Sequence, residues 1–411
     1  MSFSLIALAL AAALQSAEAA PPAPAPTPAP RPPAPPATLT ETRAPTAPGN
    51  KPAFANQTRA PVAKTAAAYQ VSTITGGLVN PWGMAFLPDG RILVTERPGR
   101  LRLVSDGKLS APLTGVPAVA AKGIAGLFDV KLDPAFAKNR AVYLSFHEQR
   151  GDLVGVSVFR GVLKSDASGF ETGEVIFHAQ PGVAKGGDMG GRMLFDRSGA
   201  LLLAIGEEGM GADVLQKLDN DLGKVVRIDT RGAAAKGNPR LPGAQPEIYA
   251  YGMRDPQGLA LDAKGRVWAM DHGPLGGDAV KLVLPGRNYG WPLIAYGLGN
   301  DRKPVGDGAT AKPGIEQPIY YYDPAIGASG LAIYDGRLFP EWRGDLLGAA
   351  LAGKHVSRLV LKGDRVVAEE RLFTEVNERI RQVVVGPDGA VYLLTDSAQG
   401  RILKVTPKPA A

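Results

Sequence analysis

Hydrophobic positions in this chain recur as pairs of short apolar runs separated by a turn rich in Asp, Pro and Gly. Each pair is typical of a β-hairpin, because the runs are too short for helices and the turn residues favour a chain reversal. Six such pairs lie between Ala68 and Pro407, at Gly83–Thr95, Leu127–Phe146, Met193–Glu207, Leu259–His272, Gly330–Leu351 and Val383–Thr395.

Six hairpins of similar pattern predict an all-β fold, namely a six-bladed β-propeller in which each hairpin belongs to one four-stranded blade. The uneven spacing of the copies fits blades whose connecting loops differ in length. A β-sandwich is the structural alternative, but it does not require so many similar hairpins. Long runs with a 3.6-residue apolar period are absent, which argues against an α/β fold. The 51 glycines and 36 prolines among 411 residues likewise favour short strands and turns.

The N-terminus has an apolar run from Leu5 to Leu14, followed by Ala17-Glu18-Ala19, an A-x-A cleavage pattern. A bilayer-spanning helix needs about 20 apolar residues, so the run is too short to be one. We predict a signal peptide over residues 1–19, a periplasmic or secreted location, and no transmembrane segment in the mature chain. No Lys or Arg precedes the run, and a peripheral apolar tail is the alternative.

Residues 20–66 are rich in Pro, Ala and Thr. Because proline has a fixed φ and no N–H, we expect a disordered, semi-extended linker here, and the propeller is expected over 67–408. A role in spanning a cell wall or binding a partner is the alternative to a plain spacer. The net charge of +7 is spread along the chain without a dense basic block, so no nucleic-acid partner is expected. The absence of cysteine excludes disulfides and thiolate chemistry.

Two polar loops flank the fourth hairpin and form the candidate site. Met253–Gln257 precedes it and Asp271–Asp278 follows it, so both loops lie at the same end of a rigid hairpin. Either loop alone is consistent with an ordinary solvated turn. Together with Asn288–Pro292, however, the stretch resembles the glucose/sorbosone dehydrogenase family, whose members carry segments similar to HRNPQGL, EHGPxGGDE and NYGWP. Pro81–Leu101 and Arg379–Asp396 also fit this family.

That resemblance implies a six-bladed propeller that binds pyrroloquinoline quinone (PQQ) and Ca²⁺. It further implies oxidation of an aldose sugar at C1 to the lactone, with electrons passed to an external acceptor. Arg254, Arg379 and Arg381 match arginines that hold the cofactor's carboxylates, a role that suits the planar guanidinium. Since alternate residues of a strand point the same way, Arg379 and Arg381 are expected to face one central cavity. Asp255 replaces the family's asparagine beside the cofactor.

The resemblance assigns the metal to the backbone carbonyls of Gly273 and Pro274, which are acceptable hard ligands for Ca²⁺. Asp278 is a further possible oxygen donor, although an ordinary turn aspartate is the simpler interpretation. For Arg254, Arg379 and Arg381, the alternative interpretation is that they are solvated surface residues that bind no ligand.

The catalytic base is where this chain departs from the family, which has a histidine followed by x-Gly-Gly-Arg-Leu. We assign Met189 to the base position, and a thioether does not accept a proton near neutral pH. Asp188 and His272 are therefore the candidate catalytic residues. Ile124 stands where the family has glutamine, so the pocket is expected to be remodelled.

The remaining histidines, His147, His178 and His355, lie away from the matched motifs and are expected to be structural or exposed. The leading functional hypothesis is a PQQ-dependent aldose dehydrogenase. Its rival is a non-catalytic propeller that binds a small anionic ligand or a protein partner, since a fold does not fix a function. A propeller lactonase with a carboxylate-bound Ca²⁺ is a third option and lacks a distinctive signature.

Overall fold

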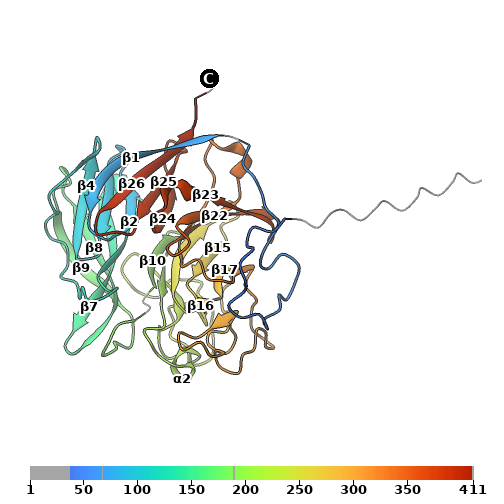
Figure 1. The fold of residues 1–411 in the computed structure, drawn as a ribbon. Coiled ribbons are helices and arrows are strands. Elements are labelled where there is room, and N and C mark those ends of the chain that lie inside the picture. The colour runs from blue at the N-terminus through green and yellow to red at the C-terminus, as the bar shows by residue number, and fades with distance from the viewer. Residues whose placement is uncertain (1–37, 67, 188–189, 410–411) are drawn as a thin grey trace, which may run out of the picture. The chain divides into compact units, whose positions relative to one another are not determined.

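The protein is described here from a computed structural model that covers residues 38–66, 68–187 and 190–409. The predicted signal peptide over 1–19 and the first part of the predicted linker, residues 20–37, lie outside the described residues. Within them, six antiparallel sheets of four strands each form six blades (Figure 1). The predicted all-β, six-bladed propeller is confirmed, and each predicted hairpin is the inner pair of strands of one blade.

The first three blades take their strands in chain order. Blade 1 contains β2 (Pro81–Phe86), β3 (Ile92–Glu96), β4 (Arg100–Ser105) and β5 (Lys108–Leu109). Blade 2 contains β6 (Leu127–Leu132), β7 (Ala141–Arg150), β8 (Leu153–Leu163) and β9 (Phe170–His178). Blade 3 contains β10 (Gly190–Phe195), β11 (Leu201–Ile205), β12 (Lys224–Ile228) and β13 (Ile248–Tyr251).

The last three blades differ in their outer strands. Blade 4 contains β14 (Pro256–Leu261), β15 (Val267–Asp271), β17 (Asp278–Val283) and β19 (Tyr320–Tyr322). Blade 5 contains β20 (Ala328–Ile333), β21 (Leu346–Ala350), β22 (His355–Lys362) and β23 (Arg365–Leu372). Blade 6 contains β24 (Ile380–Val385), β25 (Val391–Thr395), β26 (Gly400–Pro407) and, from the other end of the chain, β1 (Tyr69–Leu78).

Pairing of the two ends of the fold closes the propeller. β1 pairs with β26 in antiparallel register from Tyr69 opposite Pro407 onward, and Figure 1 shows the blue β1 beside the red β26. The first strand of each blade, from β2 through β6, β10, β14 and β20 to β24, contacts the first strand of the next, and β24 contacts β2 again. The six inner strands therefore form a closed ring.

The hydrophobic core is divided among the six interfaces between neighbouring blades. Successive side chains of a strand point to opposite faces, and both faces of an inner blade strand are covered. Leu202 and Leu203 of β11 accordingly belong to the clusters on either side of blade 3. This is why the middle strands read as continuous apolar runs in the sequence.

Short elements decorate the loops: β16 (Leu275–Gly276), β18 (Gly297–Leu298), α1 (Phe136–Asn139), α2 (Ala212–Leu215) and the 3₁₀ turns η1 (Pro340–Trp342) and η2 (Thr374–Val376). Among the residues that the structure covers, no helix has the length and apolarity needed to cross a membrane.

The expectation of an unpacked linker up to residue 66 is wrong for residues 38–66, which we name the N-terminal strap. The strap lies against blades 4 and 5, with Ala60 and Gln57 fully buried. Its backbone pairs in single bridges, Leu39 with Pro61 and Val62 with Glu369. Some of its N–H groups donate to side chains outside the strap, as Thr65 does to Glu370 at 2.6 Å and Thr46 to Asp323 at 2.7 Å. These acceptors help to fix a segment that forms no regular strand.

Candidate functional site

Every inner strand carries a register shift near its start, which positions the residues at the centre of the propeller. A β-bulge adds a residue to one strand and re-aims its side chain. The shifted positions include Trp82, Phe128, Arg192, Gln257 and Arg381. Side chains from different blades therefore converge on the axis, where a site built on rigid strands is held firmly.

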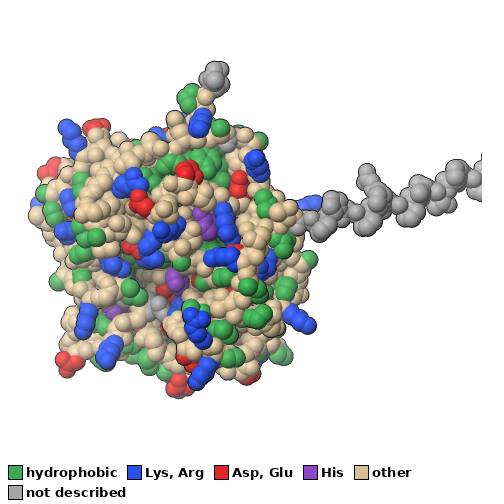
Figure 2. All heavy atoms as spheres, in the orientation of Figure 1, with side chains coloured by type: hydrophobic (Ala, Val, Ile, Leu, Met, Phe, Trp, Pro, Cys, Tyr) green, Lys and Arg blue, Asp and Glu red, His purple; other side chains and the backbone are tan. Residues whose placement is uncertain are grey.

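A central cavity of about 220 Å³ lies among these residues. Four of the predicted site residues line it together: Asp255, His272, Arg379 and Arg381. Ile124, expected in a remodelled position, also lines it. Six further lining residues were not predicted as site residues, namely Trp82, Arg97, Phe128, Gly190, Gln257 and Leu351. Figure 2 shows basic and histidine side chains near the middle of this face of the molecule.

The arginine pair shares a single carboxylate. Arg381 donates to Asp396 at 2.9 Å and Arg379 donates to the same oxygen at 3.2 Å. Arg381 is almost buried, with 7% of its side chain exposed, whereas Arg379 precedes β24 and is 48% exposed. Burial alone would raise the pKa of Asp396, but the charges of Arg381 and Arg379 hold that pKa below its ordinary value.

The guanidinium of Arg381 retains unused donor capacity. One nitrogen, Nη1, donates to Gln257 at 2.5 Å, while the buried Nε has no hydrogen-bond partner among the residues that the structure covers. Burial lowers the pKa of Arg381, and the like charges of Arg97 and Arg379 lower it further. Among the described residues, Arg97, Arg379 and Arg381 outnumber Asp255 and Asp396, so the cavity wall has an excess of positive charge. A carboxylate ligand fits that excess and the free donor.

Asp255 is buried and held by neighbours of the cavity. Its Oδ1 accepts from the backbone N–H of Gly190 at 2.9 Å and its Oδ2 from Nε2 of Gln257 at 2.6 Å. These hydrogen bonds hold the carboxylate in the wall of the central cavity. Asp255 thus helps to join the inner strands of blades 3 and 4.

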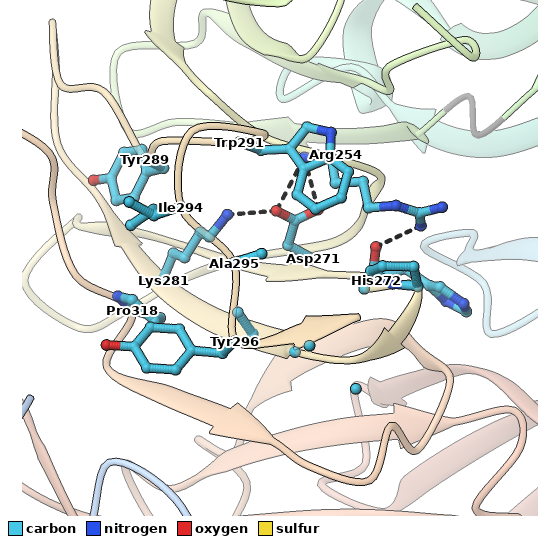
Figure 3. A pocket seen from close by; sticks show the side chains of 16 residues that line it. Arg254, Asp271, His272, Lys281, Tyr289, Trp291, Ile294, Ala295, Tyr296 and Pro318 are labelled. Atoms are coloured by element: carbon cyan, nitrogen blue, oxygen red, sulfur yellow. Dashed lines mark hydrogen bonds and ion pairs between the residues drawn. The ribbon is translucent and has the colours of Figure 1, made fainter. Parts of the chain in front are cut away.

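Arg254 lines an adjoining cavity together with Asp271, Lys281 and Trp291 (Figure 3). Its Nη1 donates to the carbonyl of His272 at 2.9 Å, and its Nε lies 3.2 Å from Glu207. Asp271 forms a buried ion pair with Lys281 and accepts from the backbone N–H of Arg254. Arg254 therefore braces the loop of His272, whereas Arg379 and Arg381 line the central cavity.

His272 lines both of these cavities. Its Nδ1 lies 2.8 Å from the carbonyl oxygen of Ala328, and since a carbonyl only accepts, Nδ1 carries the proton. In the neutral ring Nε2 then holds the lone pair. A histidine oriented in this way has the tautomer that a general base requires.

The predicted metal loop is fixed from within blade 4. The backbone N–H of Gly273 donates to Asp278 at 2.7 Å, and the other oxygen of Asp278 accepts from Ile326 and Ala328. Asp278 is fully buried and acts as a structural aspartate, as the simpler interpretation had it. No cluster of three or more His, Asp or Glu side chains suited to a metal occurs in the described part of the chain. Gly273 and Pro274 line the cavity beside His272.

Asp188 and Met189 lie outside the described residues, so their positions stay predictions. Counted back from Arg192, the pattern His-x-Gly-Gly-Arg reaches Asp188 rather than Met189. The flanking Gly187 and Gly190 donate to Glu208 and Asp255, respectively. Gly190 and Asp255 both line the central cavity.

The other three histidines have structural or surface environments. His147 is buried and lies 3.3 Å from Glu208, and His178 is partly exposed and pairs with Glu148 at 2.7 Å. Burial lowers the pKa of His355 to about 4, so this ring is neutral at ordinary pH.

The fold and the cationic cavity enclosed by its inner strands together place this protein in the class of ligand-binding six-bladed propellers. Comparison with known proteins identifies the family. The sequence profile of the Glucose / Sorbosone dehydrogenase family matches residues 78–404. Aldose sugar dehydrogenase YliI of Escherichia coli (strain K12) is 39% identical over 350 residues, which cover 83% of this chain and 94% of the relative. The chain therefore belongs to the glucose/sorbosone dehydrogenase family.

Two solved structures extend this comparison. A crystal structure of a glucose dehydrogenase is 46% identical, has a TM-score of 0.79, and the match covers 82% of this chain and 100% of that one. The PQQ-bound form of an aldose sugar dehydrogenase from Streptomyces coelicolor is 27% identical with a TM-score of 0.69, over 83% of this chain and 100% of that one.

Proposed function

We propose that this protein is a PQQ- and Ca²⁺-dependent dehydrogenase that oxidises an aldose at C1 to the lactone and passes the electrons to an external acceptor. The observation that carries the proposal is the excess of arginine in the central cavity, where a buried guanidinium N–H of Arg381 lacks an acceptor beside His272. The names of the E. coli and Streptomyces relatives support the sugar and the cofactor. We further propose export to the periplasm or outside the cell, on the signal sequence alone.

The arginines would hold the carboxylates of the cofactor. Arg381 offers its unpartnered Nε, and Arg379 and Arg97 add charge at the more open side of the cavity. Hydrogen bonds between guanidinium and carboxylate are charge-assisted and are among the stronger ones in proteins. Gly273 and Pro274 would contribute carbonyl oxygens to Ca²⁺. Bound PQQ would supply the oxidising power, since two electrons and hydrogen leave C1 of the sugar for the quinone.

His272 is proposed to accept the proton of the anomeric hydroxyl through Nε2, because its Nδ1 is engaged by Ala328. Asp188 is the other candidate base, and Arg254 holds the carbonyl of His272 and thereby orients its loop. A carboxylate acts as a base at neutral pH when its surroundings raise its pKa. Asp255 is proposed to position Gln257 beside Arg381.

Reconstitution tests the proposal. Purified protein is mixed with PQQ and CaCl₂, and the bound quinone is followed by absorbance while aldoses are assayed with a reducible dye. His272→Gln should lower the sugar-dependent rate by about 10²–10⁴-fold if it is the base, with PQQ binding retained. His178→Gln is the matched control, since His178 pairs with Glu148 and is partly exposed. An unchanged rate in His272→Gln would transfer the role to Asp188, tested by Asp188→Asn.

The rival hypothesis predicts a different pattern. A decayed dehydrogenase would bind PQQ without turnover, and Asp188→His or Met189→His would then restore part of the rate. A protein that binds no quinone at saturating Ca²⁺ would be a non-catalytic propeller for another anionic ligand or a protein partner. Robust wild-type turnover excludes both of these readings.

A further inference from the structure

The N-terminal strap reaches the site. Thr46 of the strap lines a cavity of about 420 Å³ that is also lined by His272 and Arg379. These two residues line the central cavity as well, so the two cavities adjoin. The strap lies outside residues 78–404, which match the family profile.

The strap is anchored at this point by one buried carboxylate. Asp323 accepts the backbone N–H groups of Thr46 at 2.7 Å and Ala47 at 3.0 Å. Arg59, further along the strap, donates to the carbonyl of Asp323 at 2.8 Å and to that of Glu41 at 3.1 Å. Hydrogen bonds to a charged acceptor are stronger than those between neutral groups, so Thr46 has a fixed position.

The blade side of the cavity is lined by small residues, Ala325, Gly327 and Ala352. They leave room that larger side chains would fill, and the volume falls within the 300–1,000 Å³ typical of ligand sites. Pro274 and Leu351 supply apolar surface, while His272 and Arg379 supply polar groups. An apolar wall with a few convergent hydrogen-bonding groups suits a sugar ring, which has C–H faces and hydroxyl edges.

We propose that Thr46 and the strap around it form the wall of a saccharide subsite and set the size of saccharide that the protein accepts. The subsite holds the part of the substrate remote from the oxidised C1 carbon, which lies at His272. This proposal rests on the proposed dehydrogenase function and adds a specificity-determining residue to it.

Blocking the cavity tests the wall. Thr46→Trp should raise KM for maltose by about tenfold or more, since overfilling a packed site is costly, while kcat and the Kd for PQQ stay unchanged. KM for glucose should change far less, because glucose lacks the second ring. Thr42→Trp is the matched control: Thr42 is an exposed threonine of the same strap. Equal effects of Thr46→Trp on both sugars, or none, would overturn the proposal.

Hydrogen exchange supplies a readout that does not depend on activity. Maltose should protect the amides of residues 43–50 in the PQQ- and Ca²⁺-loaded protein, and Thr46→Trp should abolish that protection. If the wild type oxidises glucose but maltose gives no protection, the subsite is refuted while the dehydrogenase stands. If no aldose is oxidised and no quinone binds, the proposed function fails. If maltose then also fails to protect these amides in the unloaded protein, the subsite is refuted as well.

Discussion

Two buried arginines on adjacent blades show how a structural ion pair differs from a ligand site. Arg358 of β22 donates to Asp345 at 2.6 Å and to Glu370 at 3.0 Å, and its Nη2 also lies 2.9 Å from Glu370 as an ion pair. Arg381 of β24 shares its one carboxylate, Asp396, with Arg379. One arginine therefore pairs with two acids in blade 5, whereas two arginines share the single carboxylate of Asp396 at the central cavity.

The two side chains are equally buried, at 6% and 7% exposure, so burial does not distinguish them. The two arginines differ instead in the balance of charge around them and in whether their N–H donors have acceptors. Nε and Nη1 of Arg358 donate to carboxylates and Nη2 lies in ion-pair distance of Glu370, while Nε of Arg381 has no hydrogen-bond partner among the described residues. A buried donor without an acceptor costs free energy in the unliganded state, and a bound anion removes that cost. Matched substitutions at the two positions make the comparison testable.

The largest expected effect is the loss of stability in Arg358→Met. Removing one partner of a buried ion pair leaves an uncompensated charge, here on Asp345 and Glu370, and costs about 3–5 kcal/mol of unfolding free energy. Urea unfolding measures it. Arg381→Met should cost less, because Asp396 keeps Arg379 at 3.2 Å. Equal destabilisation by the two substitutions would show that Arg381 is structural too.

The second effect is on PQQ affinity, and here substitution of Arg381 should have a larger effect than substitution of Arg358. Arg381→Met should weaken PQQ binding by about 1.5–3 kcal/mol, the range for a hydrogen bond to a charged group, or roughly 10- to 150-fold in Kd. Fluorescence titration with PQQ at saturating Ca²⁺ measures the change. Arg358→Met is the control and should bind PQQ with unchanged affinity per folded molecule. A matching loss in that control would erase the distinction.

The fold was predictable because its signal is local and repeated. Each hairpin shows an apolar run, a turn and a second run, and six copies specify the ring. The strap was mispredicted because proline content describes only the local chain. What fixes it is remote in sequence: Asp323 lies 277 positions after Thr46, and Glu370 lies 305 after Thr65. No local pattern indicates that such acceptors exist.

The site was predictable where a motif carried it. Arg379, Arg381, Asp255 and His272, each named from a motif, line one cavity, whereas Arg254 lines the adjoining one. Trp82 and Gln257 were missed, because the register shifts that aim them inward are properties of strand pairing. Trp82 and Gln257 each follow directly after the proline that begins β2 or β14, and this position was the sequence signal that could have identified them.

A smaller effect should come from the acids. Asp396→Asn removes the carboxylate that competes with a bound anion for Arg381 and Arg379, so the affinity for PQQ should rise, by about tenfold at most. Asp345→Asn, on the other side of the comparison, should leave PQQ affinity unchanged. The same titration reports both. A fall in affinity in Asp396→Asn would mean that Asp396 orients the arginines more than it neutralises them.

The smallest expected effect concerns the pH dependence of stability, which should have opposite signs for Asp396 and Asp345. Asp396 has a pKa below the ordinary 3.8, since the charges of Arg381 and Arg379 outweigh burial. The stability that its ionised form contributes is therefore present above pH 3.8 and is lost as the pH falls through the lowered pKa. Burial raises the pKa of Asp345, despite its hydrogen bond from Arg358. Its contribution is present below pH 3.8 and is lost as the pH rises through the raised value.

Asparagine does not titrate, so each variant lacks the pH dependence of the acid that it replaces. As the pH falls from about 6 to about 3, the stability advantage of the wild type over Asp396→Asn should shrink, whereas its advantage over Asp345→Asn should grow. Each change should be near 1.4 kcal/mol per unit of pKa shift. Urea unfolding at several pH values measures both, with the double variant as a check on additivity. If both stability differences changed with pH in the same direction, the surplus of arginine around Asp396 would not govern the ionisation of Asp396. The charge imbalance that distinguishes the two regions would then lose its main physical consequence.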